Sequence, residues 1–208
     1  MSEIYSPPRV TAAAARLKGL KIDPGVALDL TTTDGYGRPW DFSKKEMQDK
    51  AEKLFEEQEP DLILGGPMCT AHPPWQRINR LRNPMAYKRK KQESRRHFGF
   101  VCKIFRRQME KGKLLLHEHP AQADSWEENC ILEVLRLPEV QSNKMDQCQF
   151  GQSTTDGEPV KKETRWMSNC KEVLDQLNRQ CSGRGEVCSA TQSRHAVCSG
   201  RTAKEAAV

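Results

Sequence analysis

Residues 61–69 read DLILGGPMC, and residues 113–120 read KLLLHEHP. Each stretch places a continuous apolar run directly before small, prolyl or polar residues. Such runs, alternating along a chain with amphipathic helical segments, are typical of parallel strands buried on both faces of a sheet. Because ligands of such sheets bind beyond the carboxyl ends of the strands, the residues after each run are candidates for a functional site.

The segments around these two runs complete an alternating pattern. Thr11 is the expected N-cap of a first helix, and Ser43 with Glu46 forms the expected capping box of a second. The pattern predicts an α/β protein of three layers with a mostly parallel central sheet. We expect further strands at residues 2–5 and 26–30, and helices at residues 12–18, 43–58, 85–111 and 125–136.

The composition indicates one folded domain rather than a membrane or secreted protein. The chain has 208 residues, of which 30% are charged and 36% are hydrophobic, and this suits a single core. It contains no apolar run of the roughly 18 to 20 residues that span a bilayer, and no basic segment followed by an apolar run at its start. We therefore expect a soluble, intracellular protein whose eight cysteines are free thiols or metal ligands rather than disulfides.

The positive charge is concentrated in one segment. Residues 77–113 hold 14 Lys and Arg residues and two acids, whereas the whole chain has a net charge of only +6. Such a segment is either a solvated helix face or a surface for a polyanion, and we interpret it as a DNA or RNA surface. Trp75 is a candidate for stacking on a displaced base, with a core position as the alternative. The candidate nucleic-acid contacts are Trp75, Arg77, Arg80, Lys88, Arg89, Lys90, Lys91 and Arg95.

Two strand ends carry reactive side chains. Cys69 follows an irregular turn, where backbone amides can lower the pKa of a thiol and make it a nucleophile; the alternative is a small buried cysteine. Glu118 follows an apolar strand, where burial would raise the pKa of its carboxyl group and suit it to share a proton; the alternative is a carboxylate neutralised by helix N-termini or arginines. Because strand residues alternate between faces, His117 and His119 should point away from Glu118, which disfavours a metal ion at this triplet.

These two strand ends resemble those of the cytosine-5 DNA methyltransferases. That family carries its nucleophile in a Pro-Pro-Cys turn and has a Glu-Asn-Val strand end after it, and the matching residues here are 66–69 (GPMC) and 118–120 (EHP). The resemblance implies a Rossmann-like methyltransferase domain over residues 1–180. It implies that Cys69 adds to C6 of a cytosine turned out of its stack. Glu118 would then bond the N3/N4 edge, and C5 would take the methyl group of S-adenosylmethionine.

The resemblance also assigns the cofactor and a third catalytic candidate. Asp29 matches the acid that binds the ribose, and Asp41 matches the acid near the adenine. Arg165 falls in a segment, residues 161–165, that is similar to the family's later Gln-x-Arg-x-Arg run. The cofactor-binding candidates are Tyr5, Ser6, Asp29, Asp41 and Pro67.

Departures from the family pattern keep a second interpretation open. Residues 6–9 (SPPR) stand where the family has a glycine-rich cofactor loop, and Met68 replaces the second proline before the cysteine. The chain is also too short for a target-recognition domain, so loops or a protein partner would supply any specificity. The alternative is a catalytically degenerate, methyltransferase-fold protein of a mobile element or virus that binds nucleic acid.

Residues 181–208 form a cysteine-rich tail. Cys181, Cys188, His195 and Cys198 are four candidate zinc ligands, but only His195 and Cys198 have the close spacing of a ligand pair in structural zinc sites. We therefore expect a partly flexible tail with reduced thiols, and we keep zinc as the alternative.

Overall fold

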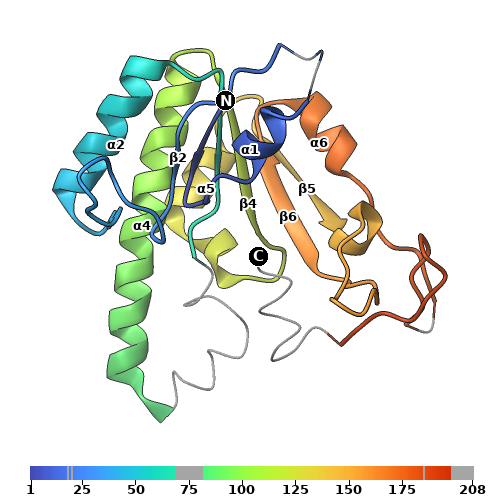
Figure 1. Ribbon diagram of the computed structural model, residues 1–208. Coiled ribbons are helices and arrows are strands. Elements are labelled where there is room, and N and C mark those ends of the chain that lie inside the picture. Colours follow the sequence, from blue (N-terminus) through green and yellow to red (C-terminus); the bar gives the residue numbers. More distant parts are fainter. Residues whose placement is uncertain (18, 20, 69–81, 185, 198–208) are drawn as a thin grey trace.

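A computed structural model of the chain describes residues 1–17, 19, 21–68, 82–184 and 186–197 and shows an α/β protein built on one mixed sheet (Figure 1). The strands lie in the order β2-β1-β3-β4-β6-β5. β2, β1, β3 and β4 are parallel, and β6 is antiparallel to both of its neighbours. The expected α/β class with a mostly parallel sheet is therefore confirmed. The strands are β1 (Ser2–Ile4), β2 (Ala27–Leu28), β3 (Leu62–Gly65), β4 (Leu114–Pro120), β5 (Gln141–Asp146) and β6 (Glu163–Ser168).

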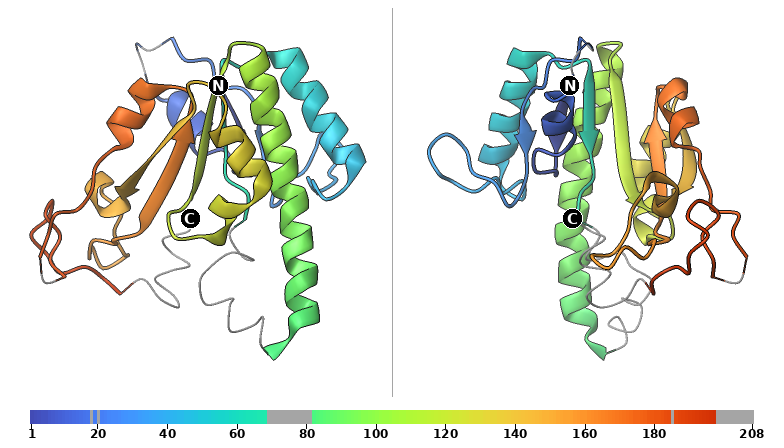
Figure 2. Two further views of the ribbon diagram at one scale, coloured as in Figure 1. Left: turned by 180° about the vertical axis from the view of Figure 1, so that it is seen from behind. Right: turned by 45° about the vertical axis from the view of Figure 1, so that its right-hand side comes forward.

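Helices cover both faces of this sheet (Figures 1 and 2). α2, α4 and α5 lie on one face, and α1 and α6 lie on the other. The first half of α4 extends well beyond the strand ends and the other helices, as Figure 2 shows. The bounds are α1 (Val10–Ala14), α2 (Lys45–Gln58), α4 (Pro84–Glu110), α5 (Asn129–Leu135) and α6 (Lys171–Leu177), with short 3-10 helices η1 (Asp124–Glu127) and η2 (Gln147–Phe150).

The strand order fixes where a ligand would bind. From β1 the chain passes to β2 on one side, and it then returns past β1 to β3 on the other side. In a parallel sheet, ligands bind outside the carboxyl ends of the strands at such a switch point. Ile4 and Gly65, the last residues of β1 and β3, pair with each other at this point.

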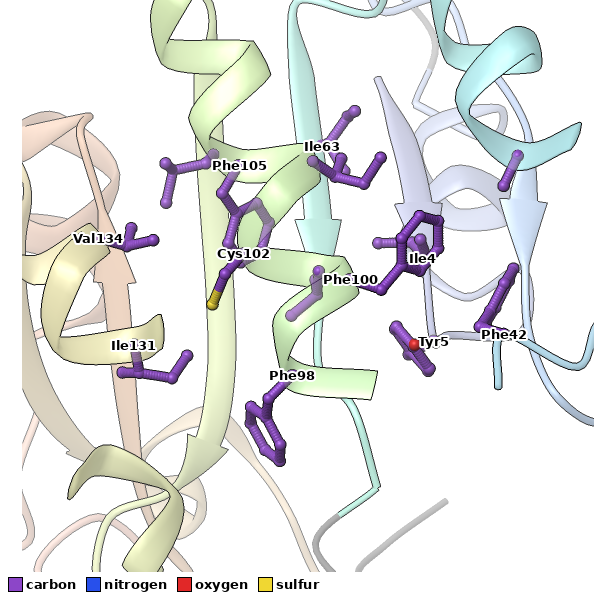
Figure 3. Packing of buried hydrophobic residues seen from close by; sticks show 14 of the residues in the cluster. Ile4, Tyr5, Phe42, Ile63, Phe98, Phe100, Cys102, Phe105, Ile131 and Val134 are labelled. Carbon is purple, nitrogen blue, oxygen red and sulfur yellow. The ribbon is translucent and has the colours of Figure 1, made fainter. Parts of the chain in front are cut away.

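The main core lies between the sheet and the helices α2, α4 and α5 (Figure 3). Ile4, Ile63 and Leu115 are buried strand residues, and they belong to the same apolar cluster as Phe98 and Phe105 of α4. Both phenylalanines lie on the apolar face that the sequence predicts for this helix. Packing of that face fixes the second half of α4 against the sheet, which leaves the first half to project.

Two expected helix starts are wrong. The hydroxyl of Ser43 donates to Asp41 at 2.6 Å instead of capping a helix, and α2 begins at Lys45. Thr11 lies inside α1 rather than before it, and its hydroxyl donates to Glu3 at 2.8 Å. In both places a carboxylate outside the helix takes the hydroxyl hydrogen, because short polar side chains bond to whichever acceptor the local backbone brings near.

Candidate functional site

The carboxyl ends of β3 and β4 lie side by side, and two histidines of β4 hold the chain where β3 ends. Gly65 pairs with His117 in the sheet, and His117 Nδ1 donates to the Gly65 carbonyl oxygen at 3.0 Å. His119 Nε2 donates to the Pro67 carbonyl oxygen at 3.1 Å. Because Pro67 has no amide hydrogen for the ladder, the second imidazole takes over the role of a strand pair and keeps this segment against β4.

Both imidazoles are buried and serve as hydrogen-bond donors. The two rings stack with their centroids 6.0 Å apart, and both meet the Trp126 ring edge to face. Burial lowers the pKa of His117 to about 4, so its ring is uncharged at neutral pH. His119 Nδ1 lies 2.7 Å from the hydroxyl oxygen of Ser125, which donates to it once Nε2 carries the ring hydrogen.

Glu118 points to the opposite face of the sheet, as strand alternation predicts. Gly66 passes directly over it: a Cβ on Gly66 would lie 2.9 Å from the Glu118 carbonyl oxygen, so glycine permits this approach. The carboxyl oxygen Oε1 is buried and has no hydrogen-bond partner among the residues that the structure describes. Burial raises the pKa of Glu118, while the positive charges of Lys162 and Arg9 work against that shift.

Two further polar atoms without partners lie in the same row of the sheet. Trp166 of β6 is directly opposite Glu118, and Asn143 of β5 is directly opposite Trp166, so the three side chains share one face. Within the described ranges, Trp166 Nε1 and Asn143 Oδ1 are buried and unpartnered like Glu118 Oε1. Buried polar groups are normally satisfied. One donor and two acceptors without described partners therefore lie in one row on this face of the sheet.

The structure does not bring Arg165 to this row. Arg165 is opposite His119 in the β4–β6 register, so it lies on the other face of the sheet from Glu118. Its guanidinium group lies over the Trp126 ring, 4.5 Å from the centroid, and donates to the Ser142 hydroxyl at 2.7 Å. This corrects the grouping of Arg165 with Glu118 that the sequence suggests. Neighbouring residues of a strand point to opposite faces of the sheet, and the β6 residue opposite Glu118 is Trp166 rather than Arg165.

The loop after β1 is closed on a buried carboxylate. Glu3 accepts hydrogen bonds from the hydroxyl of Ser6 at 2.6 Å and from the amides of Arg9 and Thr11 at 3.2 and 2.7 Å. The amides at the start of α1 therefore point inward at Glu3. Because this loop holds two prolines and no glycine, and because these amides are already used, its residues do not fit the methionine end of S-adenosylmethionine in the way that the resemblance implies.

The other cofactor candidates lie at or near these strand ends, and each is held by its own surroundings. Tyr5 has a left-handed backbone (φ 57°), and its hydroxyl bonds to His97 in the core. Asp29 follows β2 and accepts from the next turn through one carboxylate oxygen, at 2.9 Å. Asp41 accepts from the Ser43 amide and hydroxyl. Pro67, which His119 anchors, directly follows Gly66, the residue that lies against Glu118. The predicted nucleophile Cys69 and the candidates Trp75, Arg77 and Arg80 lie outside the described residues.

The basic segment divides into two halves with different surroundings. From residue 103 onward, the basic side chains of α4 and of its C-cap residue Lys111 are paired with acids. These acids lie in α2, at the C-cap of α2 and in α5. This part of the positive charge is therefore neutralised within the fold. The pairs are Lys103–Glu52, Arg106–Glu133, Arg107–Glu52, Arg107–Glu56 and Lys111–Glu59.

The projecting half of α4 carries three consecutive basic residues that no acid of the described chain neutralises. Lys88, Arg89 and Lys90 are exposed and form no ion pair with any residue in the described part of the chain. Lys91 and Arg95 both pair with Glu128, at 3.5 and 2.8 Å. These last two candidates therefore join the projecting half to the body.

A groove follows this half of the helix. A second hollow of about 410 Å³ continues it from Lys91 and Arg95 toward Glu128 and the start of α5. Tyr87 adds an aromatic ring to a basic wall, a combination that suits the stacked bases and phosphates of a single strand. The groove is lined by Pro84, Tyr87, Lys88, Lys91, Gln92 and Arg95.

A cysteine–histidine cluster lies at the end of β5, the edge strand opposite β2 in the sheet. Three of the candidate ligands, Cys181, Cys188 and His195, come together with Cys148 of η2, and their ligand atoms all lie within 4.8 Å of one another. The fourth candidate, Cys198, lies outside the described residues. Sequence spacing missed Cys148 because only the fold brings η2 next to the tail.

Hydrogen bonds to sulfur surround this cluster. Burial works to raise the pKa of the Cys181 thiol, but bonds from the hydroxyl and amide of Ser189 and the amide of Gly183 outweigh it and bring the pKa to about 6. Gln149 Nε2 donates to the sulfur atoms of Cys148 and Cys188 at 3.5 and 3.6 Å. The donor set can hold a metal ion that prefers thiolate and imidazole ligands.

Searches against known proteins give no family to compare with these sites: no family model, no curated protein and no solved structure matches the chain. No helix within the described ranges is both long and apolar enough to cross a membrane.

Proposed function

We propose that this protein binds nucleic acid through the first half of α4 and presents an unstacked base to the row of polar atoms at Glu118. The expected Rossmann-like domain is part of this proposal, and the switch point between β1 and β3 supports it. DNA is the proposed ligand, with RNA as the alternative that the same experiment distinguishes.

The main support for the proposal is the uneven distribution of ion pairs along α4. Acids of α2, of its C-cap and of α5 pair with the basic residues from Lys103 to Lys111, so this positive charge is neutralised within the fold. Lys88, Arg89 and Lys90 project past the body without such partners in the described chain. A bare cluster of three cations on a projecting helix, beside a basic groove with a tyrosine, is a surface for a polyanion.

Glu118 supports the second half of the proposal. A base that leaves its stack must exchange its pairing partners for groups in a pocket. The buried carboxyl of Glu118 and the indole N–H of Trp166 supply an acceptor and a donor that lack partners among the described residues. Burial raises the pKa of Glu118, so this carboxyl group can also share a proton with a ring nitrogen such as N3 of cytosine.

The salt dependence of binding tests the α4 surface. We would measure the affinity of the full chain for a fluorescent single-stranded oligonucleotide, a duplex and an RNA over a range of salt concentrations. If all three cations contact phosphates of a duplex, the variant Lys88→Gln/Arg89→Gln/Lys90→Gln loses about 2.7 from the slope of log K against log salt. It also loses on the order of 100-fold in affinity at physiological salt.

A matched variant controls for net charge. Lys45→Gln/Lys53→Gln/Lys171→Gln also removes three exposed positive charges, each from an i,i+4 surface pair, where the loss costs little stability. We expect this control to keep the wild-type slope. Equal slopes for wild type and both variants would refute the α4 surface, and equal loss in both variants would reduce the effect to overall charge.

Methyl transfer to cytosine is a second candidate function, favoured by the position of Glu118 beside the segment 66–68 that precedes Cys69 in the chain. The loop closed on Glu3 argues against the family's mode of cofactor binding. Calorimetry with S-adenosylmethionine, followed by transfer of a labelled methyl group to cytosine-containing DNA, separates the two candidates. Transfer that Cys69→Ser and Glu118→Gln both abolish would establish the enzyme, whereas absence of cofactor binding at high micromolar concentration leaves the binding protein.

A further inference from the structure

The tail after α6 folds back onto the end of β5 and meets η2 there (Figure 1). The amide of Cys181 donates to Asp146, the last residue of β5, at 2.7 Å. Farther along, the amide of Ala196 donates to the Pro159 carbonyl oxygen at 3.0 Å. The segment between these two anchors carries Cys188 and His195. Hydrogen bonds therefore anchor this segment at both ends, and its described residues Cys188 and His195 lie next to Cys148.

Very little apolar burial holds this loop in place. Its buried cluster, which is separate from the main core, consists of Cys148, Cys181 and Cys188. In the described part of the loop, regular structure is limited to one isolated bridge between Val187 and Arg194. Small folded units without an apolar core need a covalent or metal staple, and the residues that occupy the position of a core here are three thiols.

The donor atoms lie close enough together to share one zinc ion. With zinc–sulfur and zinc–nitrogen bonds of about 2.3 and 2.05 Å, neighbouring ligand atoms of a tetrahedron are about 3.6 to 3.8 Å apart. Cys181 Sγ and His195 Nε2 are 3.7 Å apart, and all four ligand atoms lie within 4.8 Å of one another. His195 Nδ1 donates to the Glu186 carbonyl oxygen at 2.9 Å, which turns Nε2 toward the sulfur atoms as second-sphere bonds do in metal sites.

The backbone around the cluster is built for a tight approach. A Cβ on Gly183 would lie 1.7 Å from the Val187 carbonyl oxygen, so only glycine lets the chain turn between Cys181 and Cys188. The amide of Ser189 donates to Cys181 Sγ at 3.3 Å. A bond of this kind favours a thiolate, which is the form that binds zinc.

We propose that Cys148, Cys181, Cys188 and His195 bind one Zn²⁺ ion that pins the tail to the end of β5. Four protein ligands fill a tetrahedral shell, so the ion is structural and has no open position for substrate. The three cysteines bind as thiolates, so each one that is still protonated releases its proton to solvent on binding, and the histidine binds through its neutral Nε2. The metal complex then carries a net charge of −1. This site is independent of the proposed nucleic-acid function.

Metal content and cobalt spectroscopy of the full chain test the proposal. The chain purified without chelator should contain about one zinc per molecule by mass spectrometry of the metal. After replacement by Co²⁺, the visible spectrum should show tetrahedral d–d bands and sulfur-to-cobalt charge transfer of an intensity that fits three thiolates. The spectrum reports the ligands directly, so it remains informative even where a variant fails to fold.

Four variants assign the ligands. Cys148→Ser should lose the metal, and Gly183→Ala should lower zinc affinity at least tenfold without removing a ligand. Cys170→Ser, which changes a cysteine outside the cluster, and Cys198→Ser should both keep one zinc per chain. Retention of zinc in Cys148→Ser with its loss in Cys198→Ser would overturn the ligand set. A freshly purified chain that neither holds zinc nor gives a cobalt–thiolate spectrum, or that contains a disulfide within the cluster, would overturn the site.

Discussion

Acidification should destabilise the protein through His117. Its imidazole is 1% exposed, and burial lowers its pKa to about 4 in the folded chain from 6.5 for an exposed histidine. Between these pH values the unfolded chain binds the proton and the folded chain does not. The stability from this site is therefore fully present above pH 6.5 and is lost as the pH falls toward 4. The linkage amounts to about 2.5 kcal/mol at pH 4.5.

Urea unfolding of the full chain and of His117→Gln between pH 7.5 and 4.5 measures this pH-dependent contribution to the free energy of unfolding. Glutamine keeps an N–H donor for the Gly65 carbonyl oxygen and cannot gain a proton. The free energy of unfolding of the wild type should therefore fall by about 2.5 kcal/mol more than that of the variant. His97, whose pKa burial also lowers, titrates in both proteins and cancels in the comparison.

The protonation state of the His117 imidazole can also be measured directly. In an NMR titration of the folded protein, the ring resonances of His117 should stay unchanged down to about pH 5. Parallel stability curves for the two proteins, or a His117 ring that titrates near pH 6.5, would show that burial does not lower the pKa of His117. If His117→Gln is too unstable to measure, the NMR titration decides alone.

Three further substitutions probe the strand ends. Gly66→Ala should lower the free energy of unfolding by about 1 to 3 kcal/mol, because its Cβ would lie 2.9 Å from the Glu118 carbonyl oxygen; unchanged calorimetric stability would contradict that close approach. Burial raises the pKa of Glu118, so the wild type loses stability as the pH rises through that pKa and Glu118→Gln does not. The stability of this variant relative to wild type should be greater at pH 8 than at pH 5, and an equal difference at both pH values would speak against a buried carboxyl. Arg165→Gln should cost about 1 kcal/mol by breaking the contact with Trp126 and leave DNA affinity unchanged; a loss of affinity would place Arg165 back at the binding site.

The parts of the fold with a strong local pattern could be predicted from the sequence. β3 and β4 follow from apolar runs, and α4 follows from the spacing of Phe98, Val101 and Phe105. β5 and β6 were not predicted, because QSNKMD and ETRWMS carry neither an apolar run nor a clear alternation. Their positions are set instead by pairing with other strands of the sheet. β6 pairs with β4, and the hydroxyl of Ser168 donates to the Leu115 carbonyl oxygen.

The candidate site likewise has some features that could be predicted from the sequence and others that could not. The opposite orientation of Glu118 and His119 follows from strand alternation, which needs no knowledge of the neighbours. The orientation of Arg165 depends on the β4–β6 register, and the membership of Cys148 in the cluster depends on a contact between η2 and a distant loop. Such contacts are set by the whole fold, so spacing along the chain does not indicate them.

Photo-crosslinking can show which residues of the chain contact nucleic acid. A single-stranded oligonucleotide with photoreactive thymine analogues and a central cytosine would be bound to the full chain, irradiated, digested and mapped by mass spectrometry. We expect cross-links on residues 84–96 of α4, which decrease in Lys88→Gln/Arg89→Gln/Lys90→Gln and persist in the matched charge control. Cross-links confined to α2 and α6, unaffected by either variant, would contradict it.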